Sequence, residues 1–72
     1  MRVVECVNNQ LSCDLEGVSV GERFEIKKKI VQGVYILDYI DGPLGRIVID
    51  TENYYFQKSF KFIEEWYLWI NF

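Results

Sequence analysis

Short segments in which apolar and polar residues alternate run through this chain from about residue 17 to residue 62. The clearest of them are residues 21–26, 34–40 and 45–50, and turn-forming residues separate them. A period of two places successive side chains on opposite faces of a β-strand. The pattern therefore predicts a small, curled antiparallel sheet, and it says little about chemistry.

The expected strands follow from this alternation. Residues 2–7 form the first strand, and residues 21–30 form a second with Phe24, Ile26 and Ile30 on its buried face. A turn at residues 32–33 leads into residues 34–40, both of whose faces look covered. Glycine and proline in residues 41–45 mark the strongest break, and residues 46–50 return as the next strand of a hairpin.

The end of the chain is rich in aromatic residues. Residues 54–56 and 59–62 are expected to bring rings to the end of the sheet, with Phe60 and Phe62 on one strand face. Tyr54, Tyr55 and Phe56 cannot all face inward if they alternate, so at least one ring should be exposed. In the tail, residues 64–72, apolar residues recur at both helical and strand spacing, so periodicity leaves both open.

A single all-β domain follows from these segments. A chain of 72 residues forms one domain, and its 17% aromatic content supplies large side chains for a small core. Five short strands in a flat sheet would leave edges and an apolar face exposed. We therefore expect a small, SH3-like, partly open antiparallel barrel of about five strands over residues 2–63, followed by the aromatic tail.

Composition limits the chemistry and the location. The chain has no histidine, so no serine or cysteine has the usual general base, and we expect no enzyme, no metal site and no cofactor. Cys6 lies in an expected strand and Cys13 in a polar loop, and both should be reduced thiols. Without a signal sequence or an apolar run of about 18 residues, the protein should be cytoplasmic and make no membrane contact.

Three segments together resemble a group of small bacteriophage and prophage proteins. They are residues 18–26, residues 34–38 with the turn that follows, and residues 59–63. Their order is similar to the group's Leu-x-x-Gly-Lys-x-Tyr-Glu-Val, Tyr-x-Ile-x-Asp-Asp-x-Gly and Arg-Phe layout. The chain departs from this layout at Tyr39 and Ile40, at Ser59, and in its apolar tail.

This resemblance implies an SH3-type barrel that binds a host protein. Members of the group include inhibitors of defence systems such as CRISPR nucleases or restriction enzymes. The departures leave the target unspecified. The resemblance thus implies a non-enzymatic protein-binding module that inhibits or redirects a host protein in the bacterial cytoplasm.

Aromatic side chains are the candidate partner contacts, because Trp and Tyr are enriched at the energetic centres of interfaces. Each candidate also has a purely structural alternative as core or ordinary surface, and the tail can complete the barrel or form a homodimer seam. The candidates are Tyr35, Tyr39, Tyr54, Tyr55, Trp66 and Trp69.

Charge suggests two further interpretations. Asp38, Asp41, Asp50 and Glu52 surround the central hairpin and could steer a basic partner, or could simply be solvated turn residues. The alternative function is nucleic-acid binding, with phosphates at residues 27–29 and Arg46 and a base stacked on Tyr54 or Tyr55. A net charge of −3 without a basic stripe makes this alternative the less favoured one.

Overall fold

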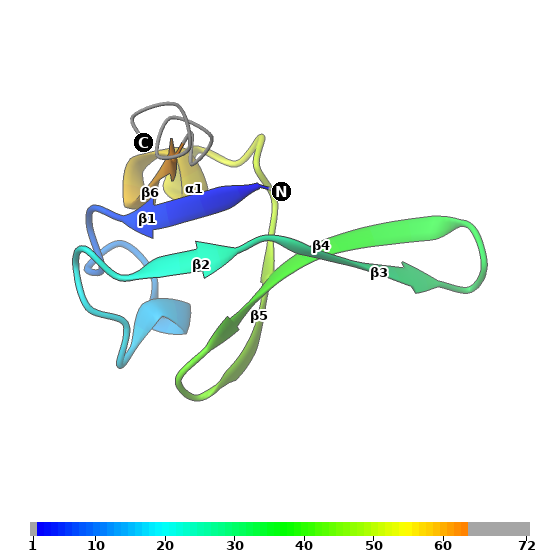
Figure 1. Ribbon diagram of the computed structural model, residues 1–72, viewed down its shortest axis with the longest axis horizontal. Helices are drawn as coiled ribbons and strands as arrows, with labels where there is room; N and C mark the ends of the chain where they lie inside the picture. Colours follow the sequence, from blue (N-terminus) through cyan, green and yellow to red (C-terminus); the bar gives the residue numbers. More distant parts are fainter. Residues whose placement is uncertain (1, 64–72) are drawn as a thin grey trace, which may run out of the picture.

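The computed structural model describes residues 2–63 as a mostly β fold with two antiparallel three-stranded sheets (Figure 1). The strand orders are β2-β1-β6 and β3-β4-β5. The two sheets do not join into one closed barrel. The elements are β1 (Val3–Cys6), η1 (Cys13–Leu15), β2 (Arg23–Glu25), β3 (Lys27–Val31), β4 (Tyr35–Gly42), β5 (Gly45–Ile49), α1 (Tyr54–Ser59) and β6 (Phe60–Ile63).

The first sheet is built around β1, whose Val3, Val4 and Cys6 are all buried. Its central position explains this burial, because β1 pairs with β2 on one side and with β6 on the other. Val4 lies opposite Phe24 in β2 and opposite Phe62 in β6. The predicted first strand is therefore confirmed, and the structure places it at the centre of a sheet.

The second sheet is a meander of two hairpins. In the first hairpin, Gln32 and Gly33 have φ of 56° and 75°. Glycine tolerates this left-handed region, and residues with positive φ allow the tight turn between β3 and β4. In the second, Gly42 pairs with Gly45 around the turn. The predicted hairpin is confirmed, and its strands extend to these two glycines.

One expected strand is two strands. Residues 21–30 were predicted to form a single element, but β2 and β3 belong to different sheets and Ile26 lies between them. The Ile26 N–H still donates to the Arg2 carbonyl oxygen at 2.8 Å, and the Ile26 side chain is buried. The chain therefore turns from one sheet into the other at a residue that is bonded to the residue before β1 and is buried in the core.

Residues 54–59 correct a second expectation. They form the helix α1 instead of extending the sheet, because Asn53 caps the segment: its Oδ1 accepts the Tyr55 N–H at 2.8 Å. Phe56 is buried and Tyr54 and Tyr55 are exposed, so the expected surface ring is confirmed. The strand count is six in the described residues, where about five were expected.

The core lies between the two sheets and α1. The buried apolar side chains come from both sheets, from η1 and its following loop, and from α1, with Phe24 and Ile47 packed against them. They are Val4, Cys6, Leu15, Val18, Ile26, Ile40, Ile49, Phe56 and Phe60. Within residues 2–63, no helix is long and apolar enough to cross a membrane.

Candidate functional site

The β3–β4 ribbon extends well beyond the core (Figure 1). Its register pairs Lys27 with Tyr39 at the base and Val31 with Tyr35 at the end. The core face of this ribbon is filled only near its base, where Ile40 is fully buried. Beyond that point β3 and β4 pair with each other, and no other helix or strand of residues 2–63 lies over them (Figure 1).

Large apolar side chains are exposed at the far end of the ribbon. Ile30 and Ile36 lie directly opposite each other and are 68% and 57% exposed. Val34 in the turn is 86% exposed and Tyr35 is 60% exposed. These four residues are called the apolar tip below. The expectation that Ile30 is buried, and that both faces of residues 34–40 are covered, is therefore wrong.

Ion pairs occupy the base of the ribbon. Lys27 Nζ lies 2.7 Å from Asp41 Oδ2, and Lys28 Nζ lies 2.9 Å from Asp38 Oδ1. Arg2 also lies 3.6 Å from Asp38. The hydrogen bond with Asp41 raises the pKa of Lys27, and the same bond lowers the pKa of Asp41. Two of the four carboxylates expected around the central hairpin, Asp38 and Asp41, are thus balanced by cations.

The other two of these carboxylates, Asp50 and Glu52, follow β5 in the chain. Asp50 follows β5, and its Oδ1 accepts the Glu52 backbone N–H at 3.0 Å in the connection to α1. This is the local side-chain bond that favours a turn. Ile49, the residue before Asp50, pairs with Asp38, so Asp50 lies near the base of the ribbon. The role of the four carboxylates toward a partner stays a prediction.

Charge is distributed unevenly along the chain. Residues 27–49 contain four basic side chains, at positions 27, 28, 29 and 46, and two acidic ones, at positions 38 and 41, for a formal charge of +2. The rest of the chain has four basic and nine acidic side chains, for a formal charge of −5. The sheet that bears the apolar tip is therefore the basic part of an acidic protein.

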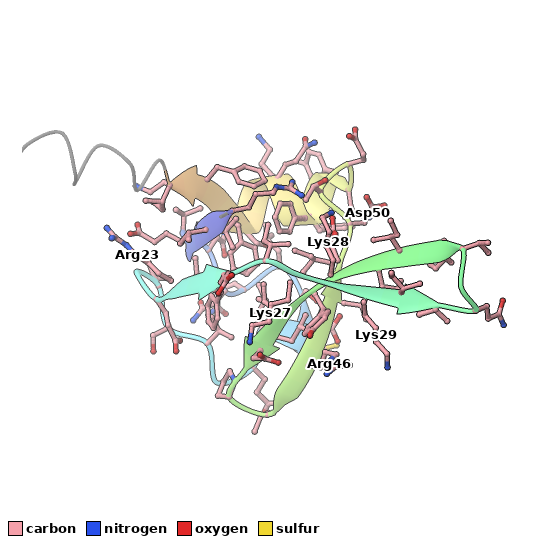
Figure 2. The ribbon with its side chains drawn as sticks, turned by 45° about the vertical axis from the view of Figure 1, so that its right-hand side comes forward. Arg23, Lys27, Lys28, Lys29, Arg46 and Asp50 are labelled. Carbon is pink, nitrogen blue, oxygen red and sulfur yellow. The ribbon has the colours of Figure 1, made fainter. Side chains whose placement is uncertain are left out.

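The two faces of the ribbon carry different charges. Figure 2 shows Lys28 on the opposite side of the ribbon from Lys27 and Lys29. Lys29 has no ion pair with any side chain in residues 2–63. Arg46 lies over the ring of Tyr39, with its guanidinium carbon 4.2 Å from the ring centroid. Positive charge is thus present on both faces of β3.

The predicted aromatic residues divide into separate groups. Tyr35 and Tyr39 share a face of β4, but Tyr39 is partly covered by Arg46 whereas Tyr35 is open. Tyr54 and Tyr55 lie on α1, edge to face at 5.6 Å, with Lys58 over Tyr54. The other two candidates, Trp66 and Trp69, lie outside the described residues.

A groove lies on another side of the molecule. It has a volume of about 520 Å³ and is lined by the loop around η1, by β5 and by α1, including Leu11, Cys13, Ile49 and Tyr55. Cys13 is exposed here as expected, and Cys6 is buried in the core. Burial raises the pKa of the Cys6 thiol. Within residues 2–63, no group of three or more Cys, Asp or Glu could hold a metal ion.

Sequence reasoning missed Ile30, Val34 and Ile36 as surface residues because alternation alone assigns apolar residues to a core. A signal was present in the sequence, because a charged residue interrupts the apolar face of each strand. Lys28 lies between Ile26 and Ile30 on that face, and Asp38 lies between Ile36 and Ile40. A charged pair on the inner face indicates that the sheet has left the core at that level.

Comparison with protein-family models, curated proteins and solved structures finds no match for this chain, so its surface alone must indicate its function.

Proposed function

We propose that this protein is a non-enzymatic protein-binding module that contacts its partner through the β3–β4 ribbon. The observation that carries the proposal is the exposure of the apolar tip at the end of a two-stranded extension. Aromatic and large aliphatic side chains are the groups that contribute most when a partner removes them from water.

The position of the tip supports this proposal. The tip residues lie past the Lys28–Asp38 pair, so they add little to the protein's own core. An exposed apolar cluster of this kind is a typical feature of an interaction site. The pairing of β3 with β4 also fixes the backbone that carries these side chains, which reduces the conformational freedom lost on binding.

The strand arrangement supports an SH3-like, partly open barrel. The chain bends from β2 into β3 at Ile26, continues through the β3-β4-β5 meander, and returns through α1 to pair β6 with β1. In this proposal the two sheets are the halves of the barrel. The chain passes from one half to the other at Ile26, where β2 leads directly into β3.

The kind of partner is also part of the proposal. The resemblance described above supports a host protein, and a bacterial defence nuclease is the kind of target that it implies. The basic sheet adds a second constraint, because it favours an acidic surface on the partner.

Capture from a bacterial lysate tests the proposal. The parent protein should retain one stoichiometric partner, and the Tyr35→Ser/Ile36→Thr variant should lose it. The matched control is Val20→Thr/Leu44→Thr, which changes two exposed apolar residues outside the ribbon strands. Equal capture by the tip variant, or no stoichiometric partner under gentle conditions, would overturn the proposal.

Nucleic-acid binding is the second candidate, and one observation favours it. Lys27, Lys29 and Arg46 share a sheet face with Tyr35 and Tyr39. Cations beside an aromatic ring are the usual elements of a single-strand site. Tyr54 and Tyr55 are on α1 and do not belong to this face. Titration with single-stranded DNA at low and high salt tests this candidate, since phosphate contacts weaken steeply with salt.

A further inference from the structure

The free edge of β3 has a chemistry of its own. Within the described strands, β3 pairs with β4 alone, so its other edge has backbone N–H and C=O groups without a strand partner. From the base outward, this edge carries three lysines, Lys27 to Lys29, and then Ile30 and Val31. The edge is therefore basic along three residues and apolar along the last two.

The other sheet edges are less suited to a new strand. β2 has only three residues, and β5 lies beside the loop around η1 across the groove. β6 has four residues, all within the first sheet. β3 has five residues on the ribbon that extends beyond the core, so it offers the longest accessible edge of these four strands.

We infer that the partner of the proposed binding module adds an extended strand to β3, and that this strand carries acidic residues opposite Lys27 to Lys29 and apolar residues opposite Ile30 and Val31. The inference rests on the proposed function and names the chemistry of its partner. Main-chain hydrogen bonds would supply affinity, and the side chains directly opposite would supply specificity.

Charge balance supports an acidic strand even though some lysines already have partners. Around the base of the ribbon there are five cations and four carboxylates: Arg2, Lys27, Lys28, Lys29 and Arg46 against Glu25, Asp38, Asp41 and Asp50. One positive charge remains in excess after the carboxylates are balanced. Lys29 is the residue at which the edge has the least compensation, because none of the described carboxylates pairs with it.

The same edge disfavours a second copy of this chain. Two β3 strands paired antiparallel about their midpoint would place Lys29 opposite Lys29, and like charges directly opposite are destabilising. A lysine-rich edge of this kind protects against self-association. Addition of an acidic strand stays favourable, so the edge of β3 selects an acidic strand over a second copy of itself.

The orientation in which a strand adds to β3 determines the residue order of a test peptide. Because the rest of the sheet is antiparallel, an antiparallel addition gives a segment of two apolar β-branched residues followed by three acidic ones, in the N-to-C direction. The probe is a capped peptide with two valines followed by three glutamates, flanked by serine and glycine. Its controls are the same peptide with lysines in place of the glutamates and a peptide of scrambled order.

Titration of the full chain, followed by NMR and calorimetry, measures binding of this probe. The glutamate peptide should bind and shift the amide signals of residues 27–31, and the lysine peptide should not bind. Lys29→Glu should weaken binding about fivefold or more, given the energies of directly opposed charge pairs. Lys58→Glu makes the same charge change on α1 and should leave binding unchanged.

Backbone methylation separates strand addition from attraction of charge alone. Two versions of the glutamate peptide carry N-methyl groups on alternate residues, one version in each of the two possible phases: odd positions or even positions. Both versions keep the same charge. Addition to β3 requires one phase to bind and the other to fail, because only alternate N–H groups face the edge. Equal binding by both phases would overturn the inference.

Three other outcomes would also overturn it. They are absence of binding by the glutamate peptide, stronger binding of single-stranded DNA with steep salt dependence, and self-association of the chain through β3 in sedimentation. The capture experiment with the tip variant is independent of these results. If the tip variant fails to capture the partner but the Lys29→Glu variant captures it as well as the parent does, the proposed function stands and strand addition to β3 is rejected.

Discussion

Lys28 lies directly opposite Asp38 across β3 and β4, with its Nζ 2.9 Å from Asp38 Oδ1, on the sheet face that buries Ile40. This pair marks the level at which the second sheet leaves the core. On one side of it Ile40 is fully buried, and on the other side Ile30 and Ile36 are more than half exposed. The same strand face is therefore interior at one end and surface at the other.

Substitutions on this face should differ sharply in how much they lower the free energy of unfolding. Ile40→Ala should lower the free energy of unfolding by about 2–5 kcal/mol, because it removes buried methyl groups and leaves a cavity. Ile36→Thr should change it by less than about 0.5 kcal/mol, because the side chain is largely in water. Urea denaturation measures both. A large loss for Ile36→Thr would contradict the exposed position of the apolar tip.

The two thiols should react at very different rates. Cys13 is exposed in the 3₁₀ turn, whereas Cys6 is fully buried and its burial raises the thiol pKa. A thiol reagent such as Ellman's should label one cysteine rapidly in the native protein and the second only on unfolding. Cys13→Ser should abolish the rapid phase. Rapid labelling in that variant would show that Cys6 is accessible.

Asp41 should contribute to stability in a pH-dependent way. Its hydrogen bond with Lys27 lowers its pKa in the folded protein, so the contribution is present above the usual Asp pKa near 3.8 and is lost as the pH falls through the folded value. The difference in unfolding free energy between the parent and Asp41→Asn should therefore be larger at pH 7 than at pH 2.

Urea titrations at both pH values measure this difference. Both partners are exposed, so the effect should be modest and weaker at high salt. Glu5 keeps its own acid dependence in the variant, because its hydrogen bond with Arg23 lowers its pKa independently. An equal difference at the two pH values would count against the Lys27–Asp41 pair.

The cap of α1 should stabilise the C-terminal part of the fold. Asn53 accepts the Tyr55 N–H, and Asn53→Ala should cost about 1 kcal/mol. Asn53→Asp keeps the acceptor and should retain most of the stability. Thermal unfolding of the two variants checks this, and equal losses would contradict the capping role.

Much of the local structure could be predicted from the sequence. Alternation located β1, β4 and β5, and the glycines of residues 41–45 located a hairpin. These features depend on neighbours in the chain, so a short window contains the information. The α1 segment was missed because its aromatic residues favour strands, whereas a single Asn53 side chain starts the helix. The aromatic candidates on β4 and α1 were predicted by residue type, but their separation was not.

By itself, the sequence determined that alternating segments pair as antiparallel strands and that no histidine-based chemistry is present, because both follow from local residue identity. The tertiary structure alone decided that the chain bends at Ile26, and that Ile30 and Ile36 leave the core while Ile40 stays inside. It also placed Arg46 on the same sheet as Lys27, Lys28 and Lys29. The physical reason is that burial and charge balance depend on which strands lie side by side, and period-two alternation is the same on a covered face and on an open one.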